Sequence, residues 1–589
     1  MKPNIKNLLA LACLTSTLPA IGAPDVKIAL PERFRLLTDQ YYDLRIEASG
    51  LANVNATLTF RDENGKDITG FFGPADEVTT DNDSNPGTLD KAWVFRARSF
   101  PTEGAKTIVA DVNDGTATGS FVQKIGVQEF KRHIASKESI ILFIGDAMGA
   151  TYRDVGRIVS QSTGNGFRGG FVDNLQEMDK MPYSGMVMTY AEENIIPDSA
   201  NTASAWATGN KTINGALNVY PDNNDWKPGN ASKLDNPRYE TLWSYLKRLQ
   251  GYKTGIVSTA EVTDATPAAE GSYTLQRGLK KDIAKQFVDG SFTSGPAFDV
   301  ILGGAKGDFD ARTVANSGDS RNLITELVGQ GFTRVNNRTE LNALGTPDKL
   351  IGLFNNGNMT VAYDKLGYVR PAGEQSTFTS SFPDQPFLEE MTEKAIDVLS
   401  KDGSPFILMV EGASIDKQSH SNHAAGTIWD VIEMDKAVGV GRAFAKENPK
   451  RKTLNLVSAD HDQSMHILGV VDTQVANATQ NVRSGVGFTG LTGGTNGFPD
   501  YEINPATGYP TNTNRYRVAV GFRTGDHTGS TVPITAEGAG AALFSGVYDQ
   551  TDIFFKMAKM IDSETSSIDN IEKEKAKMLD EIIDQNYGQ

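Results

Sequence analysis

Acidic and histidine side chains follow four separate apolar segments of the chain, where each segment ends. Segments 139–145, 254–258, 406–410 and 453–458 are followed respectively by Asp146, by Asp264 and Thr266, by Glu411 and Asp416, and by Asp460 and His461. Short apolar runs separated by helical stretches predict buried strands of a largely parallel sheet. Because ligands bind beyond the carboxyl ends of such strands, we expect these side chains to meet at one edge of the sheet.

These residue types are ligands for two kinds of divalent cation. Asp and His sets with open positions suit zinc, whereas Asp, Glu and Thr oxygens with water suit magnesium. Asp416 and His420 are four residues apart, so a helix would present both on one face. Two zinc ions about 4 Å apart would stabilise the entering and leaving oxygens of an in-line phosphoryl transfer. His133, His423 and His466 are interpreted as ordinary hydrogen-bonded residues.

The segment 198–209, which is rich in small residues, contains a candidate nucleophile. It follows Pro197 and predicts a helix that begins near Ser199, where free N–H groups favour an anion. A serine oxygen held there against zinc could ionise near neutral pH and attack phosphorus. The alternative is ordinary capping of the helix by Asp198 or Ser199.

Motifs around these residues follow one another in a fixed order from residue 139 to about 560. They are Asp198-Ser199-Ala200, Ala205-Trp206-Ala207-Thr208-Gly209, Asn214-Gly215-Ala216-Leu217, Val257-Ser258-Thr259-Ala260, Asp264-Ala265-Thr266-Pro267-Ala268-Ala269, Val410-Glu411-Gly412-Ala413-Ser414-Ile415-Asp416-Lys417-Gln418, Ala459-Asp460-His461 and His527-Thr528-Gly529. Together they resemble the bacterial alkaline phosphatases, and their joint specificity is very high.

The resemblance implies hydrolysis of phosphate monoesters, with release of inorganic phosphate, through a phosphoserine intermediate on Ser199. It also implies two Zn2+ ions and one Mg2+ ion. The implied ligands are Asp416, His420 and His527 for one zinc, Asp146, Asp460, His461 and Ser199 for the other, and Asp146, Thr266 and Glu411 for magnesium. Arg277 stands eleven residues after Thr266, where the family has its phosphate-binding arginine. Asp264 and Lys417 match residues that surround the magnesium water and the phosphate in the bacterial type.

The elements that must position these residues form an α/β fold. We expect an alkaline-phosphatase-like core over residues 132–562, with a largely parallel central sheet flanked by helices. Within it, residues 471–518 are predicted to form a lid or crown, and residues 563–589 a C-terminal helix. Residues 24–131 show period-two strands and an Asn64-Gly65 hairpin signal, which predict a small β-sandwich. Asp81, Asp83, Asn85 and Gly87 are spaced like a calcium loop, but its final Glu is missing, which favours a polar turn.

Composition narrows the function classes. The net charge of −16 over 589 residues argues against a surface that coats nucleic acid. Residues 1–23 have the charge pattern of a cleaved signal peptide, which predicts a periplasmic or secreted protein. No apolar run of about 18 residues follows, so no membrane span is expected. The single cysteine, Cys13, lies in the signal segment, which excludes disulfides from the mature chain. The family resemblance favours a homodimer.

Two alternative functions remain open from the sequence. The first keeps the fold but changes the substrate to phosphodiesters or sulfate esters. The planar fork of Arg277 argues for the monoester, whose dianion has three non-bridging oxygens. The second is a binding or adhesive surface protein in which residues 24–131 are the working part and the core is inert.

Overall fold

The computed structural model describes residues 22–80, 88–131, 138–161, 172, 174–222, 233–368, 370, 375–470, 488–490, 504, 506–509 and 518–562. Except for Gly22 and Ala23, the predicted signal peptide lies outside these residues. So do the turn that resembles a calcium loop, His133, most of the predicted lid and the predicted C-terminal helix. Among the described helices, none has the length and apolar character needed to cross a membrane.

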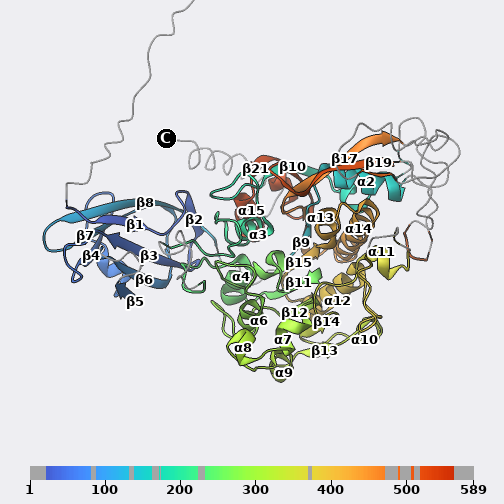
Figure 1. Cartoon of the computed structure of the whole chain (residues 1–589), viewed down its shortest axis with the longest axis horizontal. Coiled ribbons are helices and arrows are strands. Elements are labelled where there is room, and N and C mark those ends of the chain that lie inside the picture. Colours follow the sequence, from blue (N-terminus) through green and yellow to red (C-terminus); the bar gives the residue numbers. More distant parts are fainter. Residues whose placement is uncertain are drawn as a thin grey trace, which may run out of the picture.

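Two four-stranded sheets form the N-terminal part of the protein, as the period-two patterns predict (Figure 1). One has the order β1 (Asp25–Ile28), β3 (Tyr42–Ser49), β6 (Lys91–Arg98), β5 (Glu77–Thr80), and the other β2 (Phe34–Leu37), β8 (Thr118–Gln128), β7 (Gly104–Asn113), β4 (Thr57–Arg61). Buried aromatic and aliphatic side chains from both sheets form one apolar core. The chain turns back at Asn64-Gly65 as expected, but the returning segment forms only a single bridge, between Arg61 and Asp67, on the edge of β4 that does not pair with β7.

A ten-stranded sheet is the centre of the larger part. Its order is β13 (Thr333–Val335), β14 (Leu350–Leu353), β12 (Val300–Gly304), β11 (Lys253–Glu261), β15 (Phe406–Gly412), β9 (Glu138–Gly145), β16 (Lys452–Ser458), β20 (Val532–Gly538), β10 (Tyr183–Met188), β21 (Gly546–Asp549). Every pair from β13 to β16 is parallel, which confirms the largely parallel sheet. Strands β20 and β10 add antiparallel pairs.

Helices cover this sheet, and several of the predicted site residues lie on them. They are α2 (Ala150–Gln161), α3 (Ser199–Thr208), α4 (Leu242–Gln250), α5 (Ala265–Ala268), α6 (Lys280–Asp289), α7 (Lys306–Asp310), α8 (Val314–Ser317), α9 (Leu323–Gly329), α10 (Arg338–Ala343), α11 (Ala362–Lys365), α12 (Leu388–Ser400), α13 (Ser414–His420), α14 (Ala424–Glu447) and α15 (Thr551–Ile561), with α1 (Thr69–Phe72) in the N-terminal part and the 3-10 turns η1 (Glu177–Lys180), η2 (Lys401–Gly403) and η4 (Ala541–Phe544). Helix α14 is almost wholly buried over its first half, as expected of a helix inside a layered α/β core.

A small third sheet extends from the edge of the site. Its order is β17 (Asp462–Val470), β19 (Val518–Thr528), β18 (Phe488–Gly490). Strand β17 begins directly after His461, and β19 ends with His527 and Thr528, which pair with Gln463 and Asp462. This antiparallel pairing brings a histidine from far along the chain back to the strand ends of the large sheet.

The N-terminal sheets dock against the larger part through buried polar contacts. The Arg35 guanidinium donates to Asp552 at the start of α15 (2.7 Å), and the backbone of Arg35 exchanges two hydrogen bonds with the side chain of Asn210. Gln40 donates to the carbonyl oxygens of Thr208 and Glu240. Figure 1 shows α3 and α15 at this junction, so the N-terminal sheets lie against the end of the helix that begins at Ser199.

Candidate active site

Three neighbouring strands deliver acidic residues to the same edge of the large sheet. Glu411, the penultimate residue of β15, is in register with Ile144 of β9, and Ile144 is in register with Ser458 of β16. Asp146 follows β9 and donates its backbone N–H to the Gly412 carbonyl oxygen (3.3 Å). The parallel register therefore explains why carboxylates distant in sequence meet here.

Asp146, Asp460 and His461 form one tight, buried group. Their ligand atoms lie within 4.8 Å of one another. His461 Nε2 is 3.2 Å from Asp460 Oδ2 and 3.5 Å from Asp146 Oδ1. The other oxygen of Asp460 accepts the backbone N–H groups of Ala147 and His461, which fixes the orientation of this carboxylate.

Asp416 is the centre of a second group, with His420 and His527. Asp416 Oδ1 is 3.2 Å from His420 Nε2 and 3.5 Å from His527 Nε2. As the four-residue spacing predicts, Asp416 and His420 lie on one helix, α13. The ring of His461 stacks on that of His527 with centroids 3.5 Å apart, so the two groups adjoin, and Asp416, His461 and His527 are also mutually within 4.8 Å.

The donor atoms of both groups fit bound cations. His420 Nδ1 faces the Gly525 carbonyl oxygen and His527 Nδ1 faces that of Pro197, at 2.5 and 2.9 Å. A carbonyl oxygen requires a proton on Nδ1, so Nε2 of each ring turns toward the Asp416 carboxylate. The hydrogen bond to Asp416 raises the pKa of His420, and against the effect of burial Asp416 also raises the pKa of His527, so a proton on Nε2 can join each ring to the carboxylate. When that proton is released, the Nε2 lone pair and the carboxylate oxygen can bind a metal ion between them. Asp146 Oδ1, Asp460 Oδ2 and Thr266 Oγ1 are also buried without a hydrogen bond.

Burial and mutual repulsion shift the pKa values of the acidic groups at this site. Burial, together with repulsion by Asp416 and Asp460, raises the pKa of Asp146 well above its usual range. Burial also raises the pKa of Glu411 to about 7 and lowers that of His461 to about 4. Carboxylates that hold protons because they are buried and close to one another release them when a metal ion binds, so this site favours divalent cations.

Ser199 is the first residue of α3 and is 3% exposed. The side chain of Asp198 caps the helix by accepting the N–H groups of Ala200 and Asn201, which leaves the Ser199 hydroxyl free of the capping role. Ser199 Oγ lies 3.4 Å from His461 Nε2. The serine is therefore at a helix N-terminus and directly beside the metal-ligand groups, an arrangement that attracts an anion.

Arg277, Asp264 and Lys417 form a charged chain next to the serine. Arg277 Nη2 and Lys417 Nζ each lie 2.9 Å from a different oxygen of Asp264, and Arg277 Nη1 is 3.4 Å from Asp198 Oδ2. Although burial favours the neutral acid, Lys417 and Arg277 hold the pKa of Asp264 well below its usual range. Asp264 thus stays ionised and orients two cationic side chains.

Thr266 lies in the short helix α5, two residues after Asp264, and its side chain is buried. The predictions did not include Ser258, at the carboxyl end of β11. Its hydroxyl donates to Glu411 Oε2 (2.5 Å) and accepts the N–H of Ala260. A polar residue closing an apolar strand is the sequence signal that could have identified it.

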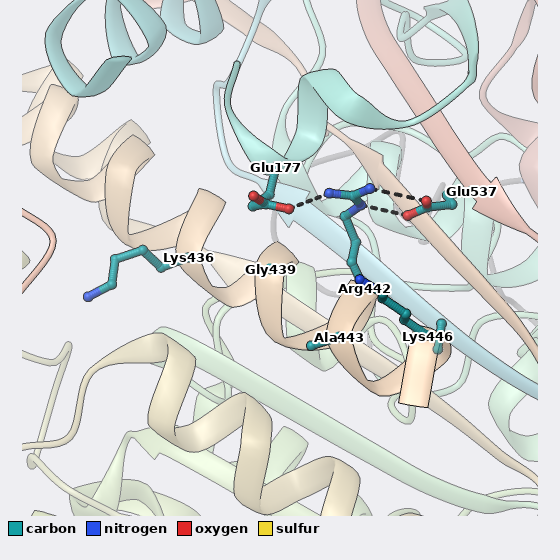
Figure 2. A pocket seen from close by; sticks show the side chains of 8 residues that line it. Glu177, Lys436, Gly439, Arg442, Ala443, Lys446 and Glu537 are labelled. Atoms are coloured by element: carbon teal, nitrogen blue, oxygen red, sulfur yellow. Dashed lines mark hydrogen bonds and ion pairs between the residues drawn. The ribbon is translucent and has the colours of Figure 1, made fainter. Parts of the chain in front are cut away.

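A separate pocket of ≈ 780 Å³ lies over the second half of α14 (Figure 2). Its lining includes Lys436, Arg442 and Lys446 from α14. The Arg442 guanidinium points between Glu177 and Glu537 and is paired with both. Its charge is satisfied within the protein and none of the predicted site residues lines the pocket, so it is not the candidate active site.

Comparison with known proteins agrees with this geometry. Residues 137–563 match the family model described as alkaline phosphatase. The chain is 30% identical to the alkaline phosphatase of Escherichia coli (strain K12) over 454 residues, covering 71% of this chain and 85% of that protein. It is also 30% identical to alkaline phosphatase H of Pseudomonas aeruginosa (strain UCBPP-PA14), covering 74% and 87%.

Among solved structures, the alkaline phosphatase of the Antarctic bacterium TAB5 superposes with a TM-score of 0.51 at 25% identity. The match covers 72% of this chain and 99% of that one. The N-terminal sheets, residues 25–128, precede the segment that the family model matches. From residue 137 to 563, the chain belongs to the alkaline phosphatase family of phosphomonoester hydrolases.

Proposed function

We propose that the protein hydrolyses phosphate monoesters through a phosphoserine on Ser199, at a site for two zinc ions and one magnesium ion. The observation that carries the proposal is the place of the Ser199 hydroxyl. It lies at the N-terminus of α3, 3.4 Å from His461 Nε2 and beside two groups of metal-ligating side chains. Ordinary capping does not explain this position, because Asp198 caps the helix.

The side chains of this site divide the chemistry between them. Ser199 Oγ loses its proton and forms a bond to phosphorus while the ester P–O bond breaks, and the leaving oxygen takes up a proton and departs as the alcohol. Water then cleaves the phosphoserine and releases inorganic phosphate. Arg277 binds two non-bridging oxygens, and Asp264 keeps its guanidinium oriented. The dipole of α3, which begins at Ser199, favours the phosphate charge throughout.

The metal ligands proposed are those implied by the family resemblance. Asp416, His420 and His527 would hold one zinc; Asp146, Asp460 and His461 would hold the other; and Asp146, Thr266 and Glu411 would hold magnesium. Bound there, the ions would supply Lewis-acid stabilisation of the attacking and leaving oxygens. The unpaired buried oxygens of Asp146, Asp460 and Thr266 support this assignment.

We also infer export to the periplasm or the medium. The support is the sequence of residues 1–23, with lysines before a short apolar run and small residues after it, and the absence of cysteine from the rest of the chain. Cell fractionation together with N-terminal sequencing of the mature protein tests this inference. An uncleaved protein in the cytoplasm would contradict it.

The substitution Ser199→Ala tests the proposed mechanism. The variant is expected to lose the phosphorylated peptide that acid quenching traps in the wild type, and most turnover, while elemental analysis finds the same zinc and magnesium content. Ser204→Ala is the matched control, since this serine lies on the same helix but donates to the Ala200 carbonyl oxygen. A phosphopeptide that persists in Ser199→Ala, or full activity of metal-free wild type, would overturn the proposal.

A further inference from the structure

Two isoleucines are exposed in the loop that leads into Ser199. Ile195 is 77% exposed and Ile196 is 48% exposed. Single exposed apolar residues are common on protein surfaces, but Ile195 is the most exposed large apolar residue in the described part of the chain. A further reason to consider this pair is its position three or four residues before the nucleophile.

The loop runs along the strand that carries His527. The Pro197 carbonyl oxygen is 2.9 Å from His527 Nδ1. Ile195 packs directly over Gly529, where a Cβ atom would lie 3.0 Å from Ile195 Cγ2 and 3.0 Å from Ile195 O. Gly529 is two residues after His527, so the apolar side chain stands beside the group formed by Asp416, His420 and His527.

This is also the side on which the site opens. The Ser199 side is buried, whereas the His420 side chain is 42% exposed. In an in-line displacement the leaving oxygen lies opposite the attacking oxygen. An ester whose phosphorus faces Ser199 must therefore point its organic group outward, past His420 and His527, and the chain after His527 continues to Gly529, on which Ile195 packs.

Hydrogen bonds hold the loop in this shape. Asn214 donates from Nδ2 to the Ile196 carbonyl oxygen (3.1 Å), accepts the Asp198 N–H at Oδ1 (3.2 Å), and donates its own N–H to Glu193. The Ile196 N–H in turn donates to Asn194 Oδ1 (3.0 Å). Because the loop is already ordered, an apolar group that binds it loses little extra conformational entropy.

We propose that Ile195 and Ile196 form an apolar rim that binds the hydrocarbon part of the substrate, so that the enzyme prefers phosphate monoesters of aryl or alkyl alcohols over those of polar alcohols. This inference rests on the proposed function, since it places the leaving group by the in-line geometry at Ser199. The rim touches the part of the ester that does not change charge during the reaction. It therefore contributes to binding of the ground state and the transition state alike.

The test compares 2-naphthyl phosphate with glycerol 2-phosphate in the wild type, Ile195→Asn, and the double variant I195N/I196N. For the double variant, KM for the naphthyl ester is expected to rise about three- to ten-fold with kcat unchanged, as loss of uniform apolar binding predicts. KM for the glycerol ester is expected to change less than about two-fold. Val314→Asn is the control, because Val314 is 71% exposed on α8, which lies away from α3 and α13 in Figure 1.

Each other outcome has a defined meaning. Equal changes in KM for both esters would overturn the proposed role of the rim. A change in the number of subunits, measured by light scattering, would also overturn it, because the isoleucines would then form a contact between copies of the chain. If Ile195→Asn fails to fold, Ile195→Ala must show a smaller effect of the same selectivity, or the inference is wrong. A wild type that hydrolyses neither ester would instead refute the proposed function.

Discussion

At the scale of single residues, the proposed role of Arg277 concerns the choice between phosphate monoesters and diesters. Its guanidinium is held by Asp264 through Nη2 and lies 3.4 Å from Asp198 through Nη1, and a guanidinium has five N–H donors in one plane with which to bind phosphate oxygens as well. A monoester dianion offers three non-bridging oxygens and more charge than a diester.

Arg277→Ala is expected to reduce kcat/KM for an aryl phosphate monoester by about 10- to 100-fold, since hydrogen bonds to charged groups contribute about 1.5–3 kcal/mol each. The loss for the matching diester should be clearly smaller. Arg277→Lys keeps the charge without the fork and should recover only part of the difference. Equal losses on the monoester and the diester would show that Arg277 does not discriminate between them.

Ser258 acts on the site through Glu411. Its hydroxyl donates to Oε2 of Glu411, whose side chain is deeply buried. Residues that orient a metal ligand typically change metal affinity by about 10- to 100-fold when removed. Ser258→Ala is therefore expected to weaken magnesium binding by this order, and added magnesium should restore activity.

The magnesium dependence of activity measures this effect in zinc-saturated enzyme. Ser272→Ala is the control, because Ser272 is equally buried but donates to the Ala268 carbonyl oxygen, away from Glu411. An unchanged magnesium dependence in Ser258→Ala would show that the hydroxyl does not position Glu411.

At the scale of elements, helix α3 is held against the turn after α5 by a buried acid. Trp206 of α3 donates its indole N–H to Glu270 Oε1 (2.9 Å), whereas Oε2 has no hydrogen bond. Burial raises the pKa of Glu270 well above its usual range. The folded protein thus binds this proton more tightly than the unfolded chain does, and stability from this group is lost as pH rises above the unfolded pKa.

Glu270→Gln keeps the acceptor for Trp206 but removes the ionisation. The difference in Tm between variant and wild type is expected to become more positive from pH 5 to pH 9, measured by differential scanning fluorimetry with saturating zinc and magnesium. Glu270→Ala, which removes the acceptor, should lower Tm at every pH. A Tm difference for Glu270→Gln that does not vary with pH would contradict a raised pKa at this position.

The strands also show which parts of the fold could be predicted from the sequence alone. The strands ending near Asp146, Glu411 and Asp460 could be predicted because buried parallel strands are short and uniformly apolar. Strands β10 and β21 could not, since half-exposed strands such as Tyr183–Met188 lack that pattern. The carbonyl oxygens that orient His420 and His527 were equally invisible, because every residue carries one.

At the scale of the whole molecule, the N-terminal sheets pack against the larger part through buried ion pairs and are not joined to it by a linker alone. Arg35 and Asp552 form a buried ion pair, and Asp43, which is fully buried, binds both Arg96 and Arg238. A separate binding module would keep such charges in water. We therefore expect the sheets and the core to unfold together.

Arg35→Met is expected to destabilise the protein by at most about 3–5 kcal/mol, because the buried Asp552 carboxylate loses its 2.7 Å partner and keeps only Arg33, at 3.6 Å. The double variant Arg35→Met with Asp552→Asn should recover part of this loss. Calorimetry measures both, and the wild type should show a single transition. Two transitions, with residues 24–131 melting apart from the rest, would contradict the joint unfolding.

The contact between Arg35 and Asp552 also has a consequence for when the enzyme can become active. These two residues are 517 positions apart, and Ser199 and His461 are 262 apart. Contacts between distant segments form late and slowly during folding. During synthesis, helix α3 can pack against His461 and the last described helix, α15, only after both have been made. An incomplete chain therefore has no assembled site. Activity therefore appears only after nearly the whole chain has been made.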